Sequence, residues 1–147
     1  MKTIIYSLLI GVLLLPLSVH AQQTIRVQLI GTWVFDYNAS FAKMESKVKA
    51  KFDAISQERR SRIENAYRGR KININSDGSY LQVLADGRQI IGTWVLNSKN
   101  QTLEITNLRG QMQEQKIKEL THTALTLKPK GIGKGQMILT ELHYTKL

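Results

Sequence analysis

One octapeptide decides how this chain folds: Leu29-Ile30-Gly31-Thr32-Trp33-Val34-Phe35-Asp36. It returns almost unchanged as Ile90-Ile91-Gly92-Thr93-Trp94-Val95-Leu96-Asn97, and the two copies hold the only tryptophans of the chain. Apolar residues spaced two apart share one face of a strand, and a glycine lets a neighbouring backbone come close. The repeat therefore predicts two strands that each bury an indole. The predicted structural positions are Gly31, Trp33, Gly92 and Trp94.

The first 21 residues have the pattern of an export signal. Lys2 supplies a positive start, residues 4–17 are apolar, and Val19-His20-Ala21 offers small residues before a cut. The apolar stretch of about 14 residues is shorter than the roughly 20 that span a bilayer. We therefore predict cleavage after Ala21 and an exported protein, periplasmic or secreted, with one domain over residues 22–147.

The chain contains no cysteine. Disulfides and thiolate metal sites need this residue, and so does the lipid anchor of exported bacterial proteins, so none of the three is expected. No cofactor and no metal site are expected either. The 126 residues beyond the predicted cleavage site are enough to form one hydrophobic core.

Positive charge is concentrated in one quarter of the chain. Without Lys2 there are 20 basic and 11 acidic residues, and residues 40–71 supply +6 of the resulting +9. Such a surface attracts anionic partners, and for an exported protein lipid or polysaccharide phosphates come before nucleic acid, which is not expected. A solvated helix face is the alternative interpretation. The candidates for contact with an anionic membrane surface are Lys47, Lys51, Arg59, Arg60 and Arg62.

The spacing of apolar residues changes after the first tryptophan strand. One helical stripe is formed by Phe41, Met44, Val48, Phe52 and Ile55. Ser40 fits the N-cap of a first helix, and Ser56 fits the N-cap of a second helix that ends at Gly69. This predicts two consecutive helices, or one helix bent near Ser56, inserted at about residues 40–68 with basic residues on the outer face.

From Arg70 onward, short alternating stretches are separated by turn sequences such as Asp77-Gly78 and Asp86-Gly87. Strands are expected at residues 72–74, 80–85, 88–97, 103–107, 111–120, 124–128 and 136–145. With the first tryptophan strand this makes eight. A mostly β fold follows, an eight-stranded antiparallel up-and-down barrel with a helical insertion after its first strand, because closure removes both sheet edges. An open sheet wrapped on the helix is the alternative.

The order of several short motifs resembles a known family. Gly-x-Trp at Gly31 to Trp33, opening an eight-strand meander, is similar to the lipocalins and the wider calycin superfamily. The resemblance is closer to the lipocalin-like domains of exported bacterial proteins, common in the Bacteroidetes, and covers about residues 29–145. The motifs that carry it are Leu29-Ile30-Gly31-Thr32-Trp33, Ser56-Gln57-Glu58-Arg59, Tyr67-Arg68-Gly69, Asp77-Gly78-Ser79-Tyr80 and Gly92-Thr93-Trp94. It implies a lipocalin-like barrel and export, but no agreed ligand.

One position departs from the lipocalin pattern. In many lipocalins an arginine near the end of the last strand packs over the first tryptophan, whereas here no arginine follows Arg109 and only Lys146 is near that place. A lysine cannot stack as a planar guanidinium does. The closed end of the barrel is therefore expected to differ from that of a lipocalin.

The parity of the strands predicts which side chains face the barrel interior. An eight-stranded barrel either fills its interior or leaves room for one small molecule, and an apolar interior suits a lipophile. The alternative is that these side chains only form the core. On the last strand Ile138 is a further inward residue. The candidate ligand contacts are Phe35, Ile74, Leu96, Ile105, Leu127, Leu142 and Tyr144.

No arrangement of residues points to an enzyme. His122 and His143 lack the spacing of metal ligands, and His143 with Glu141 fits a surface pair better than acid–base machinery. The glycine-rich run at residues 131–135 opens a strand, unlike a phosphate-binding loop, which opens a helix. Two hypotheses remain: a protein that binds a small lipophilic molecule in its barrel, and an envelope-associated interaction protein that uses its basic helices.

Overall fold

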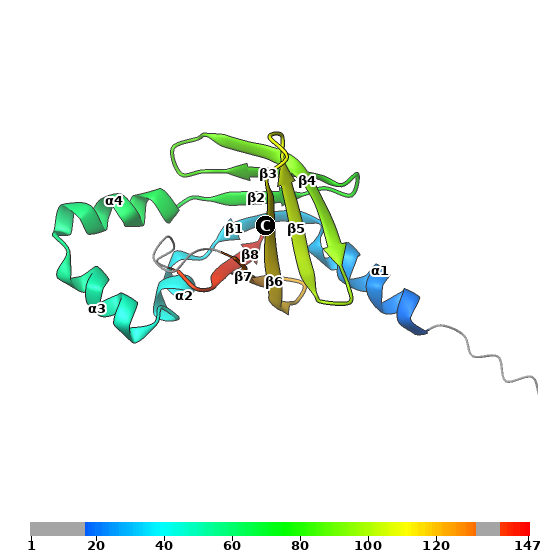
Figure 1. Ribbon diagram of the computed structural model, residues 1–147, viewed down its shortest axis with the longest axis horizontal. Coiled ribbons are helices and arrows are strands. Elements are labelled where there is room, and N and C mark those ends of the chain that lie inside the picture. Colours follow the sequence, from blue (N-terminus) through cyan, green and yellow to red (C-terminus); the bar gives the residue numbers. More distant parts are fainter. Residues whose placement is uncertain (1–16, 132–138) are drawn as a thin grey trace, which may run out of the picture.

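The computed structural model describes residues 17–131 and 139–147. Its helices are α1 (Leu17–Leu29), α2 (Tyr37–Ala42), α3 (Ser46–Ala54) and α4 (Gln57–Tyr67). Its strands are β1 (Gly31–Phe35), β2 (Lys71–Ile74), β3 (Ser79–Val83), β4 (Gln89–Asn97), β5 (Thr102–Asn107), β6 (Met112–Leu120), β7 (Ala124–Pro129) and β8 (Leu142–Lys146). Figure 1 shows α2, α3 and α4 beyond one end of the strands and α1 at the other.

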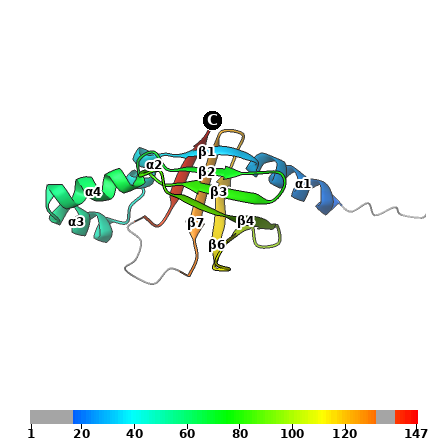
Figure 2. The same ribbon diagram turned by 90° about the horizontal axis from the view of Figure 1, so that it is seen from above.

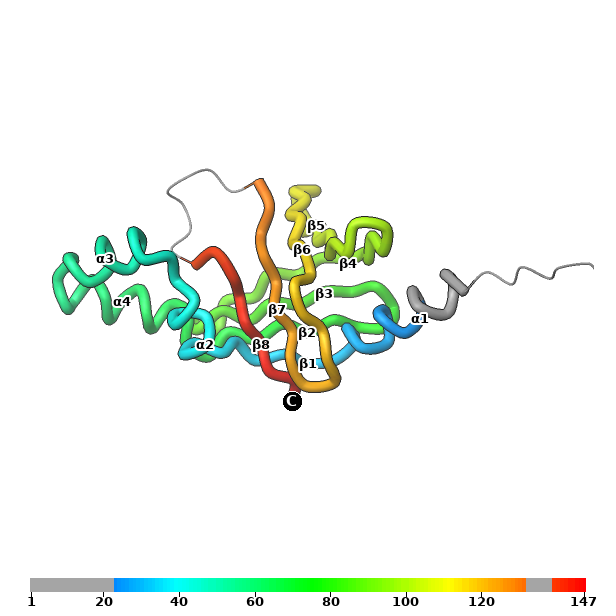
Figure 3. The backbone as a smooth tube through the Cα atoms, turned by 90° about the horizontal axis from the view of Figure 1, so that it is seen from below, coloured from blue at the N-terminus to red at the C-terminus, as the bar shows by residue number. Residues whose placement is uncertain are grey.

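The strands that the structure describes form one closed antiparallel barrel in sequential order. Each pairs with the next along the chain, and β1 closes the circle by pairing with β8, where Phe35 lies opposite Tyr144. Figure 3 shows β8 running beside β7, and Figure 2 shows β1, β2 and β3 side by side. The predicted eight-stranded up-and-down barrel is confirmed, and the open sheet is excluded.

The chain turns at both barrel ends as the turn sequences predict, but β3 ends at Val83 instead of residue 85. The last strand begins at Leu142 instead of the predicted residue 136. Residues 132–138 lie outside the described part of the chain, so the inward position predicted for Ile138 and most of the glycine-rich run lie outside it too.

The insertion after β1 contains three helices instead of one or two. Asp36, not Ser40, caps the first of them: its Oδ1 accepts a hydrogen bond from the Ala39 N–H at 2.9 Å. Ser40 lies inside α2, is 1% exposed, and its Oγ accepts from the backbone N–H of His143 at 2.9 Å. The N-cap prediction for Ser40 was therefore wrong, because Asp36 ends the strand and takes the capping role first.

The second predicted cap is confirmed. The Oγ of Ser56 accepts a hydrogen bond from the Arg59 N–H at 3.4 Å, and α4 ends two residues before Gly69. Gly69 has a φ of 77°, the left-handed conformation that glycine adopts most readily after a helix. The chain then enters β2, so the helical insertion returns directly to the barrel.

The tryptophans of the repeated octapeptide make equivalent hydrogen bonds. The indole N–H of Trp33 donates to the Leu29 carbonyl at 2.8 Å, and that of Trp94 donates to the Asn75 carbonyl at 2.8 Å. A cation also lies over each ring. The Lys146 Nζ is 4.9 Å from the centre of Trp33, and the Arg26 guanidinium carbon is 4.6 Å from the centre of Trp94.

Helix α1 covers the end of the barrel that holds these tryptophans. Leu29 has no exposed surface, and the Lys146 ammonium donates to the Gln28 carbonyl at 2.9 Å. Lys146 thus reaches the lipocalin arginine's position over Trp33, but it binds as a point charge instead of stacking. The sequence analysis did not predict α1, because it assigned residues 1–21 to an export signal.

The export signal stays a prediction. Residues 1–16 lie outside the described part of the chain, and the predicted cut after Ala21 falls within α1. Cleavage there would leave Gln22–Leu29, the segment that contains every α1 contact with the barrel named above. Within the described residues no helix is long and apolar enough to cross a membrane.

Candidate functional site

The seven predicted interior residues all lie on the inner faces of the strands. Cross-strand partners in the register share a face, as Phe35 and Tyr144, Leu127 and Leu142 do. Six of the seven are buried, between 0% and 7% exposed, and Leu96 is half-buried. They are Phe35, Ile74, Leu96, Ile105, Leu127, Leu142 and Tyr144.

Two tyrosines accompany these apolar side chains. Tyr80 lies opposite Ile74 and Gly92, and it is 3% exposed. Burial raises the pKa of Tyr80 well above its usual value, and the neighbouring Tyr144 adds to the increase. Burial likewise raises the pKa of Tyr144, against the opposing effect of Arg70. Both phenols are therefore neutral at any physiological pH, so the interior contains hydroxyl groups but no phenolate.

A continuous series of aromatic rings connects the interior with the helices. Phe35 lies 5.6 Å from Tyr144 and 5.7 Å from Tyr67, measured between ring centres. Tyr67, at the end of α4, is 6.0 Å from Phe41 of α2, and Phe41 is 5.5 Å from Phe52 of α3. These spacings are those of favourable aromatic pairs. One apolar path thus runs from the helical cap, defined as α2–α4, into the barrel.

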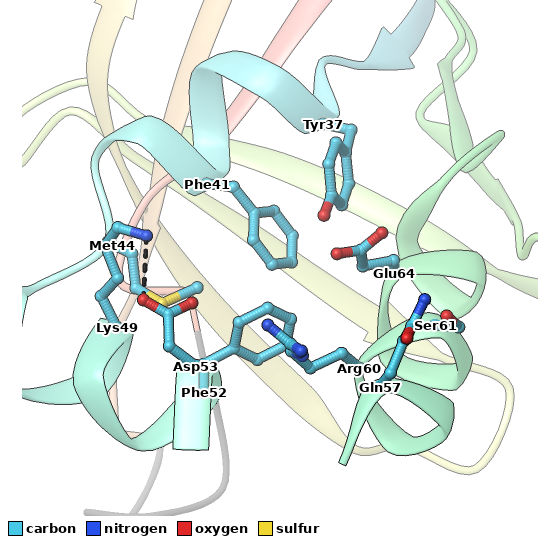
Figure 4. Close-up of a pocket in the computed structure, with 10 residues that line it drawn as sticks. All are labelled: Tyr37, Phe41, Met44, Lys49, Phe52, Asp53, Gln57, Arg60, Ser61 and Glu64. Carbon is cyan, nitrogen blue, oxygen red and sulfur yellow. Dashed lines mark hydrogen bonds and ion pairs between the residues drawn. The ribbon is translucent and has the colours of Figure 1, made fainter. Parts of the chain in front are cut away.

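The outer end of this path opens into a cavity of about 440 Å³ between the three helices. In Figure 4, Tyr37 and Phe41 reach into it from α2, while Gln57, Arg60 and Glu64 reach into it from α4. Its lining combines three aromatic side chains with four charged ones. The complete lining is Tyr37, Phe41, Met44, Lys49, Phe52, Asp53, Gln57, Arg60, Ser61 and Glu64.

Most charges around this cavity are already paired. Lys49 and Asp53 form an ion pair at 3.2 Å, and Glu64 lies 3.8 Å from Arg68. Partial burial, followed by the hydrogen bond and charge of Glu64, raises the pKa of Tyr37 to about 12, against the effect of Arg68. The Arg68 guanidinium also lies 3.7 Å from the centre of the Tyr37 ring. The charged part of the lining is therefore mixed in sign and largely paired, and it lies among the aromatic rings.

The five predicted surface cations lie on two helices. Lys47 and Lys51 belong to α3, and the three arginines belong to α4. Four are exposed, whereas Arg60 is half-buried in the cavity wall. Arg62 forms an ion pair with Glu58 at 2.9 Å. Lys47, Lys51 and Arg59 are the members that are both exposed and free of ion pairs within the described residues.

The basic surface continues onto the barrel, which the sequence did not reveal. A second cavity, of about 350 Å³, lies between α4 and the turn from β3 to β4. It is lined by Arg62, Arg70 and Arg88, with Asp86 as its acidic member. Arg88 and Asp86 form an ion pair at 2.7 Å, and Arg70 lies 4.1 Å from the centre of Tyr67. Only the fold brings residue 88 next to the helices.

His143 lies on the outer face of the barrel. Its Nδ1 is 3.1 Å from the Thr126 hydroxyl, and its Nε2 is 3.7 Å from the Glu141 carboxylate. The predicted His143–Glu141 pair thus exists, although it is partly buried instead of exposed. Within the described residues, no group of three histidine or acidic side chains could hold a metal ion.

No family model and no curated protein matches the chain. Among solved structures, it is similar to a DUF4847 family protein from Bacteroides vulgatus ATCC 8482. The two are 16% identical with a TM-score of 0.48, over 83% of this chain and 96% of that one. At this identity and TM-score, the likeness identifies neither a family nor a function.

Proposed function

We propose that this protein is an exported, lipocalin-like binding protein that holds a small lipophilic molecule in its barrel. The observation that carries the proposal is the aromatic path from Phe52 and Phe41 through Tyr67 to Phe35 and Tyr144. These rings belong to the hydrophobic core, and Phe41 and Phe52 also line the cavity between the helices, so the core reaches this cavity without an intervening polar layer. A lipophile that enters between the helices would follow this path without contacting the charged outer surface.

The two barrel ends support this direction of entry. Helix α1 covers the tryptophan end, where Leu29 and Trp33 have no exposed surface. Among the described residues, the opposite end is covered by the helical cap, whose short helices pack through aromatic and aliphatic side chains such as Phe52 and Met44. Segments with few buried contacts open at low free-energy cost, so the cap is the end that opens.

Native mass spectrometry on protein purified from the organism that makes it tests the proposal. We expect a native mass that exceeds the denatured mass by one small molecule. The denatured mass also reports whether residues 1–21 have been removed. A native mass equal to the denatured mass, unchanged after incubation with a mixture of lipophiles, would contradict ligand binding.

A pair of variants on one strand locates the ligand. Ile105 faces the interior and is 6% exposed, while its neighbour Thr106 faces outward between Thr93 and Met112. Ile105→Trp should fill the interior and abolish the excess mass, and Thr106→Trp should retain it. Circular dichroism of both variants checks that each is folded. Equal retention of the ligand in both would place it outside the barrel.

The second candidate function is contact between the basic helices and an anionic membrane surface. The specific observation is that Lys47, Lys51 and Arg59 project into solvent without an ion-pair partner in the described part of the chain. Basic side chains near an anionic surface contribute about 1 kcal/mol each. This contact does not require a ligand in the barrel, so the two functions are tested separately.

Charge reversal separates this contact from a general effect of net charge. Reversing Lys47, Lys51 and Arg59 to glutamate should weaken binding to phosphatidylglycerol vesicles about 100-fold or more at low salt. The matched control reverses Lys99, Lys116 and Lys118, three exposed cations of the barrel, and should retain most binding. Vesicle sedimentation at rising salt measures both. Equal losses in the two variants would show that only net charge matters.

A further inference from the structure

Gln115 is a buried polar side chain on the inner face of the barrel. In the register of β5, β6 and β7 it lies opposite Leu103 on one side and Pro129 on the other. Residues directly opposite in an antiparallel pair point to the same face, and Leu103 has no exposed surface. The amide of Gln115, 5% exposed, therefore points into the apolar interior.

Among the described residues, the oxygen of this amide has no hydrogen-bond partner. Gln115 Oε1 is buried, and none of the described residues donates to it. Asn107, also on the inner face, is different: its oxygen accepts from the backbone N–H groups of Arg109 and Gln111, which shapes the turn between β5 and β6. The inward amide of Asn107 thus has a structural use that Gln115 lacks.

A buried amide oxygen without a hydrogen-bond partner is unfavourable, because it has lost its hydrogen bond to water without gaining another. Methionine or leucine at this position would fill the same space without that cost. A polar group that arrived with a ligand would give this glutamine the missing partner. Because a carboxamide can accept through its oxygen and donate through its NH₂, it suits a hydroxyl or an amide.

The small number of charged side chains in the interior restricts the chemical class of the ligand further. Among the described strand residues that face inward, Lys146 is the charged one, and it is bound to the Gln28 carbonyl at the closed end. An ionised carboxylate or ammonium beside Gln115 would be buried without a counter-ion, which is far more costly than burying a neutral polar group. The neutral phenols of Tyr80 and Tyr144 fit the same conclusion.

We propose that the barrel binds an uncharged amphiphile, an apolar chain or ring system with a hydroxyl or amide group that hydrogen-bonds to Gln115. This inference rests on the proposed binding function and names its ligand class. It separates long-chain alcohols and amides from free fatty acids, which the overall positive charge of the protein would otherwise favour.

Three twelve-carbon probes that differ only in the head group test the inference. Dodecanol, dodecanoate and dodecylamine compete against the neutral fluorescent probe N-phenyl-1-naphthylamine at pH 7.5. Dodecanol should bind at least tenfold more tightly than either charged probe. Gln115→Met should weaken dodecanol about tenfold, the equivalent of one lost hydrogen bond of about 1.4 kcal/mol, and leave dodecanoate unchanged.

Gln113→Met is the matched control. Gln113 lies on the same inner face two residues nearer the helical end, but its side chain is exposed, so dodecanol should bind this variant as it binds the parent. If the three probes bind equally, or Gln115→Met leaves dodecanol unaffected, the inference is overturned and the binding function stands. If neither the fluorescent probe nor any amphiphile binds, the proposed function fails together with the inference.

Discussion

Replacing Trp33 with alanine is expected to lower the free energy of unfolding by about 3–5 kcal/mol, a large part of the stability of a domain this size. Trp33 has no exposed surface and its indole N–H donates to the Leu29 carbonyl at 2.8 Å. The change removes the largest fully buried side chain of the described chain, leaves that carbonyl without its donor, and frees Lys146 from the ring. Urea denaturation followed by circular dichroism measures the loss.

Two further variants show whether the indole itself is responsible. Val95→Ala, at a 57% exposed position on the outer face of β4, should change the free energy of unfolding by no more than about 0.5 kcal/mol. Trp33→Phe keeps an aromatic ring but loses the N–H donor, so its effect should fall between the other two. A loss below about 1 kcal/mol for Trp33→Ala would mean that the indole does not close this end of the barrel.

Most of the fold could be predicted from the alternation of apolar and polar residues along the chain. Because side chains in a strand alternate strictly between two faces, the order of the strands and the inward residues could be predicted from the sequence. The repeated Gly-x-Trp then identified β1 and β4 as strands that bury an indole. Each of the seven predicted interior positions faces inward for this reason.

Features that depend on distant contacts were not predictable. Ser40 fits a helix N-cap by its type, but its hydroxyl is used by His143, more than one hundred positions later. Likewise, nothing local distinguishes Tyr67 from an ordinary residue at a helix end, although its ring joins Phe35 to Phe41. Such roles arise only when the helices fold back against the barrel.

Parts of the candidate site could be predicted from the sequence, and other parts depend on contacts between distant residues. The apolar interior follows from parity, whereas the cavity between the helices depends on how three short helices pack. The inward position of Gln115 was only partly predictable. Its place opposite Leu103 could be predicted once β5 and β6 were aligned, but the sequence analysis assigned no inward residues to the more polar strand β6. A polar residue at an inward position of a strand was the signal that could have identified Gln115 as a candidate site residue.

Gly92→Ala is expected to destabilise the barrel by about 3 kcal/mol, because a side chain there has no space. A Cβ on Gly92 would overlap the carbonyl of Thr106 and lie 2.9 Å from its carbon and 3.0 Å from the Asn107 Cα. These are backbone atoms of the paired strand β5, so β4 and β5 would have to separate. Urea denaturation of the variant measures the effect.

Gly110→Ala is the control that separates this steric clash from backbone strain. Gly110 has a φ of 75° and open space around it, so alanine there meets only the conformational penalty of about 1–2 kcal/mol. Equal losses in the two variants would contradict the close approach of β5. The repeated glycines then differ in cause. Gly31 has a φ of 142°, and a Cβ there would meet the flexible side chain of Lys146, whereas a Cβ at Gly92 would meet the backbone of its neighbouring strand. The same two-residue spacing to tryptophan thus satisfies two separate physical requirements.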